Sequence, residues 1–326
     1  MRWYMTQLLL TAIWLTLLLL PAGCGTNRDA GGPRSGKLKV VATFSVIGDL
    51  VHNVAGDQVE LVTLVGPDSD VHTFEPAPTD GVALAKADVL FENGAGLEPW
   101  LDGLYKSSQS KARRVVVSKG LKLIEADEEE HKRDQKAPKK DSGGHKHEDL
   151  DPHVWHDVRN VMHIVEAIRD QLAELDPPNA EKYKANAASY MQQLKDLDGW
   201  VVQTVATLPE GERKLVTSHD TFGYFSRRYG FQVLGSGLES VSTEASDPSA
   251  ADFAKLCDSI KAAKVPAIFA ENVQNPKLMQ RLAREAGVRL GPPLFTDALG
   301  KTGSEGDTYA KMMRYNVTTI VGQLKR

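Results

Sequence analysis

Short apolar and β-branched runs alternate with segments of helical period along most of the chain, and this alternation limits the fold more than any other feature. In the first half, the predicted strands are 38–44, 59–65, 88–92 and 114–118, and the predicted helices are 46–55, 79–86 and 98–108. Strands and helices that alternate at this spacing form mostly parallel sheets with helices on both faces. The sequence therefore predicts an α/β fold.

The alternation returns near the C-terminus. There the predicted strands are 214–218, 231–234, 267–271 and 290–295, and the predicted helices are 220–229, 249–264, 276–286 and 308–324. The two halves share no visible sequence repeat, so we predict that they are similar in architecture only. The body that follows the N-terminal segments, about 290 residues, is long enough for two lobes with their own cores.

Two long helical patterns lie between the halves. In 157–175 apolar residues recur three or four apart, as one buried helix face requires, and Asp157 is the expected N-cap. Pro177 and Pro178 then interrupt the helical pattern. A second pattern follows over 179–208, and a helix of this length would be roughly 45 Å long at about 1.5 Å per residue. We therefore expect an N-terminal lobe (37–176), a connecting helix (177–209) and a C-terminal lobe (210–326).

The first 24 residues have the features of a secretory signal, with a short basic start, an apolar run and small residues before Cys24. The apolar run is shorter than the roughly 20 residues of a membrane-spanning helix, so a permanent anchor helix is the weaker interpretation. Cys24 stands where bacterial lipoproteins carry their lipidated cysteine, and ordinary cleavage that discards this stretch is the alternative. Residues 25–36 form the expected flexible tether. These features predict an extracytoplasmic protein, in the periplasm or on the cell surface, anchored to the membrane by lipid.

One segment, 125–149, is unlike a packed domain because it is crowded with charged residues and glycine and contains no large apolar residue. Such a composition predicts a disordered, solvated loop within the N-terminal lobe. The segment also contains His131, His145 and His147, which either assist in collecting metal or belong to a plain linker.

Net charge and cysteine content limit which partners and cross-links the protein can have. The formal net charge is −4 and no long basic run occurs, which argues against nucleic acid as a partner. Besides Cys24, Cys257 is the other cysteine, so the body can form no internal disulfide. We expect Cys257 to be a small buried hydrophobe in a helix, and the protein to be a monomer.

Four of the residues that can bind a metal lie in predicted loops, two in each half. His72 follows a strand, His153 precedes a helix, and His219 and Asp297 follow strands. Because ligands of open α/β sheets gather outside the carboxyl ends of strands, these groups are candidates to converge in a cleft between the lobes. Three imidazoles and a carboxylate suit four-coordinate Zn²⁺ and can also hold Mn²⁺ or Fe²⁺. Taken one at a time, a loop histidine is more often a surface or hydrogen-bonded residue than a ligand, and Asp297 is compatible with a cap of the following turn.

The sequence motifs around these four residues are more informative about function than their spacing. The segments 71–76, 151–155, 218–224 and 296–300 resemble, in order, the four ligand motifs of the zinc and manganese ABC-importer solute-binding receptors. The resemblance extends from about Leu38 to the C-terminus and includes the strand 267–271. It implies two α/β lobes joined by one long helix, with a metal site between them. It further implies the ligand set His72, His153, His219 and Asp297.

Details of the resemblance favour the zinc branch. His219 stands where many manganese receptors carry glutamate, and the histidine-bearing loop is similar to loops of zinc receptors. The chain departs from the pattern at His156, which replaces the apolar residue usual after Trp155, and at Val158, which replaces a common proline. His156 is either a spare ligand or a residue that packs or faces solvent.

The resemblance implies a receptor that captures a divalent metal and delivers it to an importer permease with its ATPase, and that is not an enzyme. A manganese or iron(II) receptor of the same fold is the alternative, and a secreted zinc hydrolase and a surface adhesin are more distant ones. Other signals are weak. His52 and His163 lie in helical patterns, and Gly94–Pro99 begins like a dinucleotide loop but has Pro99 where the third glycine belongs.

Overall fold

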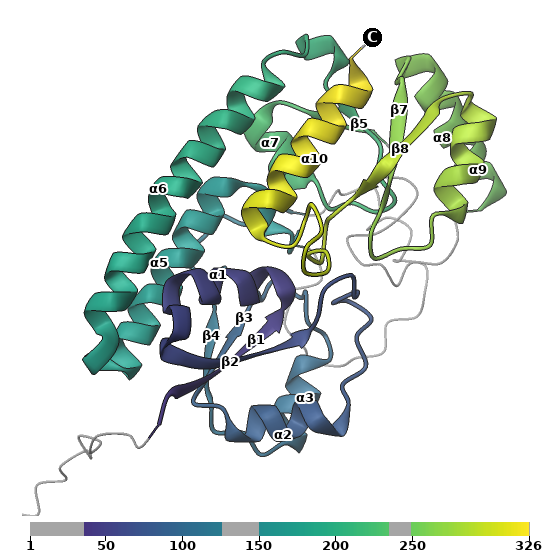
Figure 1. Cartoon of the computed structure of the whole chain (residues 1–326). Coiled ribbons are helices and arrows are strands. Elements are labelled where there is room, and N and C mark those ends of the chain that lie inside the picture. The colour runs from purple at the N-terminus through teal and green to yellow at the C-terminus, as the bar shows by residue number, and fades with distance from the viewer. Residues whose placement is uncertain (1–35, 126–149, 235–248, 326) are drawn as a thin grey trace, which may run out of the picture. The chain divides into compact units, whose positions relative to one another are not determined.

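A four-stranded parallel sheet organises the N-terminal half of the protein (Figure 1). The computed structural model describes residues 36–125, 150–234 and 249–325. The strands are β1 (Leu38–Phe44), β2 (Val59–Val65), β3 (Val89–Glu92) and β4 (Arg113–Val116), in the order β2-β1-β3-β4. All neighbouring pairs are parallel. Each strand lies where the sequence predicts one, within two residues at either end.

Side-chain alternation along these strands explains why helices cover both faces of the sheet. Val40 and Ala42 belong to the main core, with helices α1 (Ser45–Ala55) and α5 (Val158–Leu175). Val41 points to the opposite face and packs in a smaller cluster with α2 (Pro78–Lys86) and α3 (Leu101–Ser107). The predicted start of α3 at residue 98 is wrong, since the residue before Pro99 is disfavoured in helical geometry and the helix begins at Leu101.

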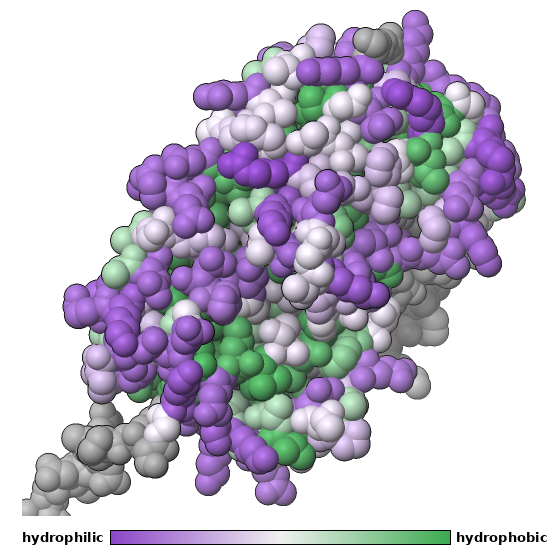
Figure 2. All heavy atoms as spheres, viewed as in Figure 1, coloured by the Kyte–Doolittle hydropathy of each residue, from purple (hydrophilic) through white to green (hydrophobic). Residues whose placement is uncertain are grey.

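The longest helix, α6 (Ala180–Val205), connects the two halves. It follows α5, whose N-cap is Asp157 as predicted: the Asp157 carboxylate accepts a hydrogen bond from Arg159 N. One face of α6 is buried and packs against α1 and α5 of the N-terminal half and against α10 (Tyr309–Leu324) of the C-terminal half. Hydrophilic side chains predominate on the molecular face drawn in Figure 2, including those over the outer side of α6.

Two pairs of parallel strands form the C-terminal half. β5 (Lys214–Leu215) pairs with β6 (Gln232–Val233), and β7 (Ala267–Glu271) pairs with β8 (Arg289–Leu294). A backbone hydrogen bond from Phe269 N to Val216 O joins the two pairs. The other elements are the helices α7 (Gly223–Tyr229), α8 (Ala250–Ala263) and α9 (Lys277–Ala286). Short 3₁₀ helices occupy Gly56–Gln58, Val154–His156, Pro177–Asn179 and Glu210–Glu212.

β5 and α7 are both shorter than predicted, for one reason. The chain leaves the ladder after Leu215, and the Thr217 hydroxyl donates to His219 O at 3.0 Å, an alternative to strand pairing. The chain then turns past His219 before α7 begins at Gly223. Apart from these bounds, the α/β class, the parallel sheets and the two halves joined by one long helix are confirmed.

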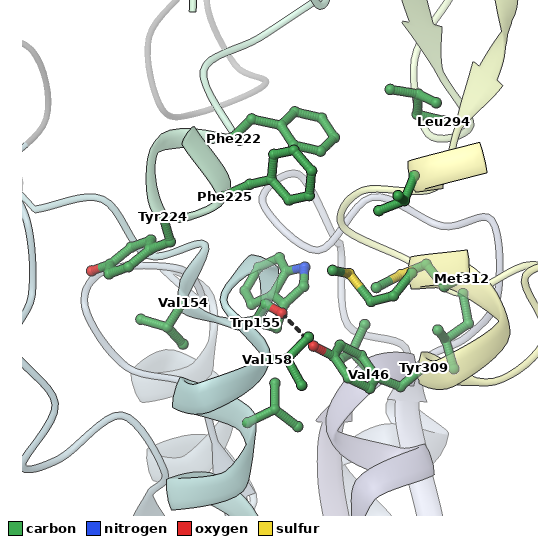
Figure 3. Packing of buried hydrophobic residues seen from close by; sticks show 14 of the residues in the cluster. Val46, Val154, Trp155, Val158, Phe222, Tyr224, Phe225, Leu294, Tyr309 and Met312 are labelled. Carbon is green, nitrogen blue, oxygen red and sulfur yellow. Dashed lines mark hydrogen bonds between the residues drawn. The ribbon is translucent and has the colours of Figure 1, made fainter. Parts of the chain in front are cut away.

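The main cluster of buried apolar residues includes members of both halves and is continuous between them. Figure 3 shows Trp155 among residues of both halves. Tyr309 OH donates to Trp155 O at 2.9 Å, and Trp155 Nε1 donates to Thr296 O at 2.9 Å. Trp155 therefore joins the two halves both by apolar contact and by hydrogen bonds.

Backbone groups of the C-terminal half also bond to side chains at the start of α1. Leu299 N donates to Ser45 Oγ at 2.9 Å, and Tyr309 N donates to Asp49 Oδ2 at 3.0 Å. Tyr309 is the first residue of α10, so the Asp49 carboxylate satisfies an N–H that the helix itself leaves free. These two bonds hold α1 against the C-terminal half.

Several predictions concern residues outside the described ranges. These are the signal segment 1–24 with Cys24, the tether 25–36 except Gly36, and the segment 125–149 except Glu125, with His131, His145 and His147. Among the described helices, none is long and apolar enough to cross a membrane. Cys257 is a free thiol buried in α8, as predicted.

Candidate metal centre

The four residues that the sequence singles out lie together. His72 is in the turn that follows β2, His153 immediately precedes a 3₁₀ helix, His219 lies beyond β5, and Asp297 lies beyond β8. Each residue is at most 4% exposed. Two come from each half, and three follow the carboxyl ends of parallel strands, where ligands of α/β sheets gather.

The ligand atoms are spaced as a single small ion requires. His72 Nε2 lies 3.3 Å from His153 Nε2, and His219 Nε2 lies 3.1 Å from Asp297 Oδ2. Asp297 Oδ2 is 3.5 Å from His72 Nε2, and all four ligand atoms lie within 4.8 Å of one another. Four donors placed about 2.0–2.1 Å from a tetrahedral zinc ion would lie roughly 3.3 Å apart. Three of the distances between the described atoms are therefore close to those of a tetrahedral zinc site.

His153 is oriented by a carboxylate behind it. Its Nδ1 lies 2.7 Å from Asp151 Oδ1, and its backbone N–H donates to the same oxygen at 2.9 Å. Nε2 is thereby directed to the cluster. Burial lowers the pKa of His153 to about 3 and raises the pKa of Asp151 to about 7. A neutral imidazole whose Nδ1 is engaged by a carboxylate is the form in which histidine binds metals.

His219 lies against the carboxylate of Glu271, the last residue of β7. Its Nδ1 lies 2.6 Å from Glu271 Oε2, and its backbone N–H donates to Oε1 at 3.0 Å. Thr296 Oγ1 donates to Oε2 at 2.8 Å and so fixes the carboxylate. Glu271 was not a predicted site residue, although a strand that ends in a buried glutamate, 267–271, was a signal that could have revealed it.

The pKa values of His219 and Asp297 shift in opposite directions in the metal-free cluster. Burial alone would lower the pKa of His219, but the carboxylates of Glu271 and Asp297 outweigh it and hold that pKa well above its usual value. Burial would raise the pKa of Asp297, but His219 and His153 hold it well below its usual value. A protonated His219 beside an ionised Asp297 follows, and a metal cation would replace that proton.

Hydrogen bonding at the centre is incomplete. Within the described residues, Asp297 Oδ2 and both ring nitrogens of His219 are buried and lack a well-aligned hydrogen-bond partner, although they lie close to one another and to Glu271. Buried polar atoms without aligned partners are uncommon and need an explanation. A cation bound among Nε2 atoms and carboxylate oxygens would satisfy His219 Nε2 and Asp297 Oδ2, whereas His219 Nδ1 faces Glu271.

The loop that carries His72 is held by neighbouring residues. His72 N donates to Asp70 Oδ1 at 2.9 Å, and Trp100 Nε1 donates to Val71 O at 2.8 Å. The ring of Phe74 meets the ring of Trp100 edge to face, with centroids 4.9 Å apart. These contacts fix the backbone on both sides of His72.

His156 packs in the interior and lies outside the four-residue cluster. It is fully buried, its ring faces Phe222 with centroids 4.6 Å apart, and burial lowers its pKa to about 3. Its Nε2 lies 3.2 Å from Thr221 Oγ1, and Thr221 Oγ1 donates to Asp297 Oδ1 at 3.5 Å. The structure confirms the alternative in which His156 packs in the interior. The sequence did not predict its hydrogen bond to Thr221.

The other candidate groups from the sequence lie away from the cluster or already have hydrogen-bond partners. His52 is exposed on α1, and His163 Nε2 is 2.9 Å from Lys119 O. In the turn that begins like a dinucleotide loop, Asn93 N and Gly94 N donate to the carboxylate of Glu98. The N–H groups that a phosphate would need are therefore satisfied from within the turn.

Comparisons with known proteins give one consistent result. A family model described as the periplasmic component A of a zinc-uptake complex matches residues 40–323. The manganese-binding lipoprotein MntA of Halalkalibacterium halodurans is 36% identical over 323 residues, which cover 99% of this chain and 100% of the relative. The metal ABC transporter substrate-binding lipoprotein FimA of Streptococcus parasanguinis is 31% identical over 97% of each chain. The solved structure of the periplasmic zinc-binding protein TroA of Treponema pallidum matches with a TM-score of 0.77 and 34% identity, covering 89% of this chain and 100% of that one.

Proposed function

The chain belongs to the family of periplasmic A components of zinc-uptake complexes, and we propose that its cargo is one zinc ion held by His72, His153, His219 and Asp297. It is the substrate-binding component of a metal ABC importer, so its partners are the permease and ATPase of that importer. The relatives bear names that specify zinc in one case and manganese in another, so family membership leaves the metal open.

The observation that carries the zinc assignment is the donor set with its spacing. Three Nε2 atoms and one carboxylate oxygen suit four-coordinate zinc, and three of the distances between them are 3.1–3.5 Å. Manganese or iron(II) is the alternative of the same fold, since Asp297 Oδ1 lies 3.6 Å from His153 Nε2 and is near enough to become a fifth donor.

Capture and delivery suit this site better than hydrolysis. A catalytic zinc keeps three protein ligands and an open position for water, whereas four protein donors converge here. The donors are also at most 4% exposed, which leaves little room for a substrate beside the ion. The chain's relatives are named as binding proteins, in agreement with a receptor.

The anchor and the segments outside the described residues complete the proposal. The names of two relatives include the word lipoprotein, which supports lipidation of Cys24 after removal of residues 1–24. Residues 25–36 would then tether the body to the membrane, and His131, His145 and His147 would assist in collecting metal. The body would act as a monomer.

Elemental analysis of the purified protein, followed by competition of Zn²⁺ against Mn²⁺ and Fe²⁺, tests the proposal. We expect one tightly held zinc ion, strongly weakened by His219→Ala and unaffected by His52→Ala, a matched change at an exposed histidine of α1. Preferential occupancy by manganese or iron would keep the receptor and overturn its metal. A protein that binds none of these metals would overturn the function itself.

A further inference from the structure

The two oxygens of Asp297 have different surroundings. Oδ2 lies 3.1 Å from His219 Nε2 and 3.5 Å from His72 Nε2, so it faces the middle of the cluster. Oδ1 lies 3.6 Å from His153 Nε2 on one side and accepts a hydrogen bond from Thr221 Oγ1 at 3.5 Å on the other. The hydroxyl of Thr221 and a bound ion would therefore compete for the same oxygen.

The outcome of that competition sets the coordination number. With three imidazoles, one oxygen of Asp297 gives four donors, and both oxygens give five. Zinc is well satisfied by four donors at tetrahedral corners, whereas manganese favours additional oxygen ligands. A group that occupies Oδ1 thus raises the affinity for zinc relative to the affinity for manganese.

We propose that the hydroxyl of Thr221, supported by His156, biases Asp297 towards one metal-binding oxygen and thereby favours zinc over manganese at the site. This inference rests on the proposed function. Thr221 and His156 are specificity-determining positioning residues: neither belongs to the cluster of four, and both act through Asp297.

Proton placement explains why a histidine lies behind Thr221. The Thr221 hydroxyl has a single proton, and when it donates that proton to Asp297 its oxygen can only accept. His156 Nε2, 3.2 Å from this oxygen, must then carry the imidazole proton, and Nδ1 becomes the bare nitrogen. Nδ1 is buried without a hydrogen-bond partner in the described part of the chain, an arrangement that suits a bare nitrogen better than an N–H.

Both residues are fixed in place. Thr221 and His156 are fully buried, and Thr221 N donates to His219 O at 3.1 Å, which ties its backbone to a residue of the cluster. The His156 ring lies against Trp155 and Phe222, with centroids 5.7 and 4.6 Å away. At 3.5 Å the contact with Asp297 is longer than the roughly 2.8 Å of a strong O–H···O bond, so the hydroxyl biases the carboxylate without holding it rigidly.

Substitution of Thr221 in the purified full chain tests the proposal. Thr221→Val removes the hydroxyl at nearly constant volume, and Thr221→Ser keeps the hydroxyl as the matched control. The probes are Zn²⁺ and Mn²⁺ in competition titrations, and the readout is the ratio of the two affinities. We expect Thr221→Val to lower the zinc-to-manganese ratio roughly tenfold, the scale of a hydrogen bond to a charged group, and Thr221→Ser to keep it.

Cobalt supplies an independent readout of coordination number. The visible absorption of Co²⁺ is intense in four-coordinate sites and weaker in five-coordinate ones, so Thr221→Val should weaken the bands that wild type and Thr221→Ser share. If Thr221→Val does not fold, Thr221→Ala makes the same test without added bulk. An unchanged ratio, or an equal loss of both metals with an unchanged cobalt spectrum, would overturn the inference. Wild type that binds no zinc would instead overturn the proposed function.

Discussion

His153 Nδ1 lies 2.7 Å from Asp151 Oδ1, and both side chains are withdrawn from solvent. The C-terminal half has a contact of similar length, in which His219 Nδ1 lies 2.6 Å from Glu271 Oε2. In each half, one carboxylate therefore directs one imidazole, and the nitrogen that meets the other half is Nε2. The geometry of the cluster is set as much by Asp151 and Glu271 as by the residues that form it.

Asp151→Asn should weaken zinc binding about tenfold, because carboxylates behind metal-binding histidines typically contribute ten- to a hundredfold in affinity. The amide can still accept from His153 N but lacks the charge that favours the correct ring orientation. Competition with a chromogenic chelator measures the affinity. Asp170→Asn, an exposed change on α5, is the control and should leave affinity unchanged. Equal affinities in both variants would contradict a role for Asp151.

Zinc affinity should rise with pH. Burial opposes protonation of His219, but Glu271 and Asp297 outweigh it and hold the pKa of His219 well above its usual value in the metal-free protein. That proton stabilises the metal-free fold fully below the unfolded histidine pKa of about 6.5, and the stabilisation is lost as pH rises through the raised folded pKa. Below the folded pKa, zinc must displace the proton, so affinity falls about tenfold per unit of decreasing pH.

Calorimetry in two buffers of different ionisation enthalpy counts the protons released. We expect about one proton per zinc ion at pH 7, the one from His219. Binding at pH 7 that released no proton would show that His219 is already neutral and that the carboxylates do not outweigh its burial.

Tyr309→Phe should lower the free energy of unfolding by about 1–2 kcal/mol, because it removes the hydroxyl that donates to Trp155 O and leaves that buried carbonyl unsatisfied. Tyr315→Phe, on the same helix, removes a hydroxyl from a half-buried ring that packs on Phe295 and should cost less. Urea unfolding of both variants measures the difference. Equal losses would mean that the bond to Trp155 contributes nothing specific.

The thiol of Cys257 should resist thiol-reactive dyes in the folded protein. It is 4% exposed, and burial raises its pKa, so both access and the thiolate form are suppressed. Full reaction is expected in denaturant. Rapid labelling without denaturant would indicate that α8 opens readily.

Replacement of residues 126–149 by a short glycine linker should leave zinc affinity at the cluster within about twofold of wild type, since the sequence predicts a loop there and loops tolerate large length changes. The flanking residues already meet: Glu125 and Leu150 form an antiparallel bridge, and Asp151 N donates to Ile124 O at 3.0 Å. The measurement is the same competition titration. A large loss of affinity at the cluster would mean that the histidines of this segment belong to the site.

Periodicity predicts most of the fold because it reports which face of an element is buried. The strand 267–271 and the N-cap Asp157 are found where the pattern places them. Periodicity does not reveal where side chains compete with the backbone. β5 therefore ends early at Leu215, where the Thr217 hydroxyl takes a bond near the turn.

The candidate site is predictable in part. The residues His72, His153, His219 and Asp297 are recognisable from their local motifs, and the structure brings them together, while their role as ligands stays a prediction. Contacts between distant segments carry no local signal. Thr221 and His156 are 65 residues apart in sequence, and their contact depends on how α7 packs against the 3₁₀ helix Val154–His156.

Because hydrogen bonds join α1 to the C-terminal half, the affinity for the cargo and the rate of its exchange depend on different parts of the protein. Equilibrium affinity depends on the donors, whereas a hydrated ion can enter or leave a cluster this deeply covered only when the halves part. The bonds from Leu299 N to Ser45 and from Tyr309 N to Asp49 must then break. Two receptors with identical donors could thus have equal dissociation constants and very different residence times. A permease that acts on α1 would then control release without contacting the metal-binding atoms.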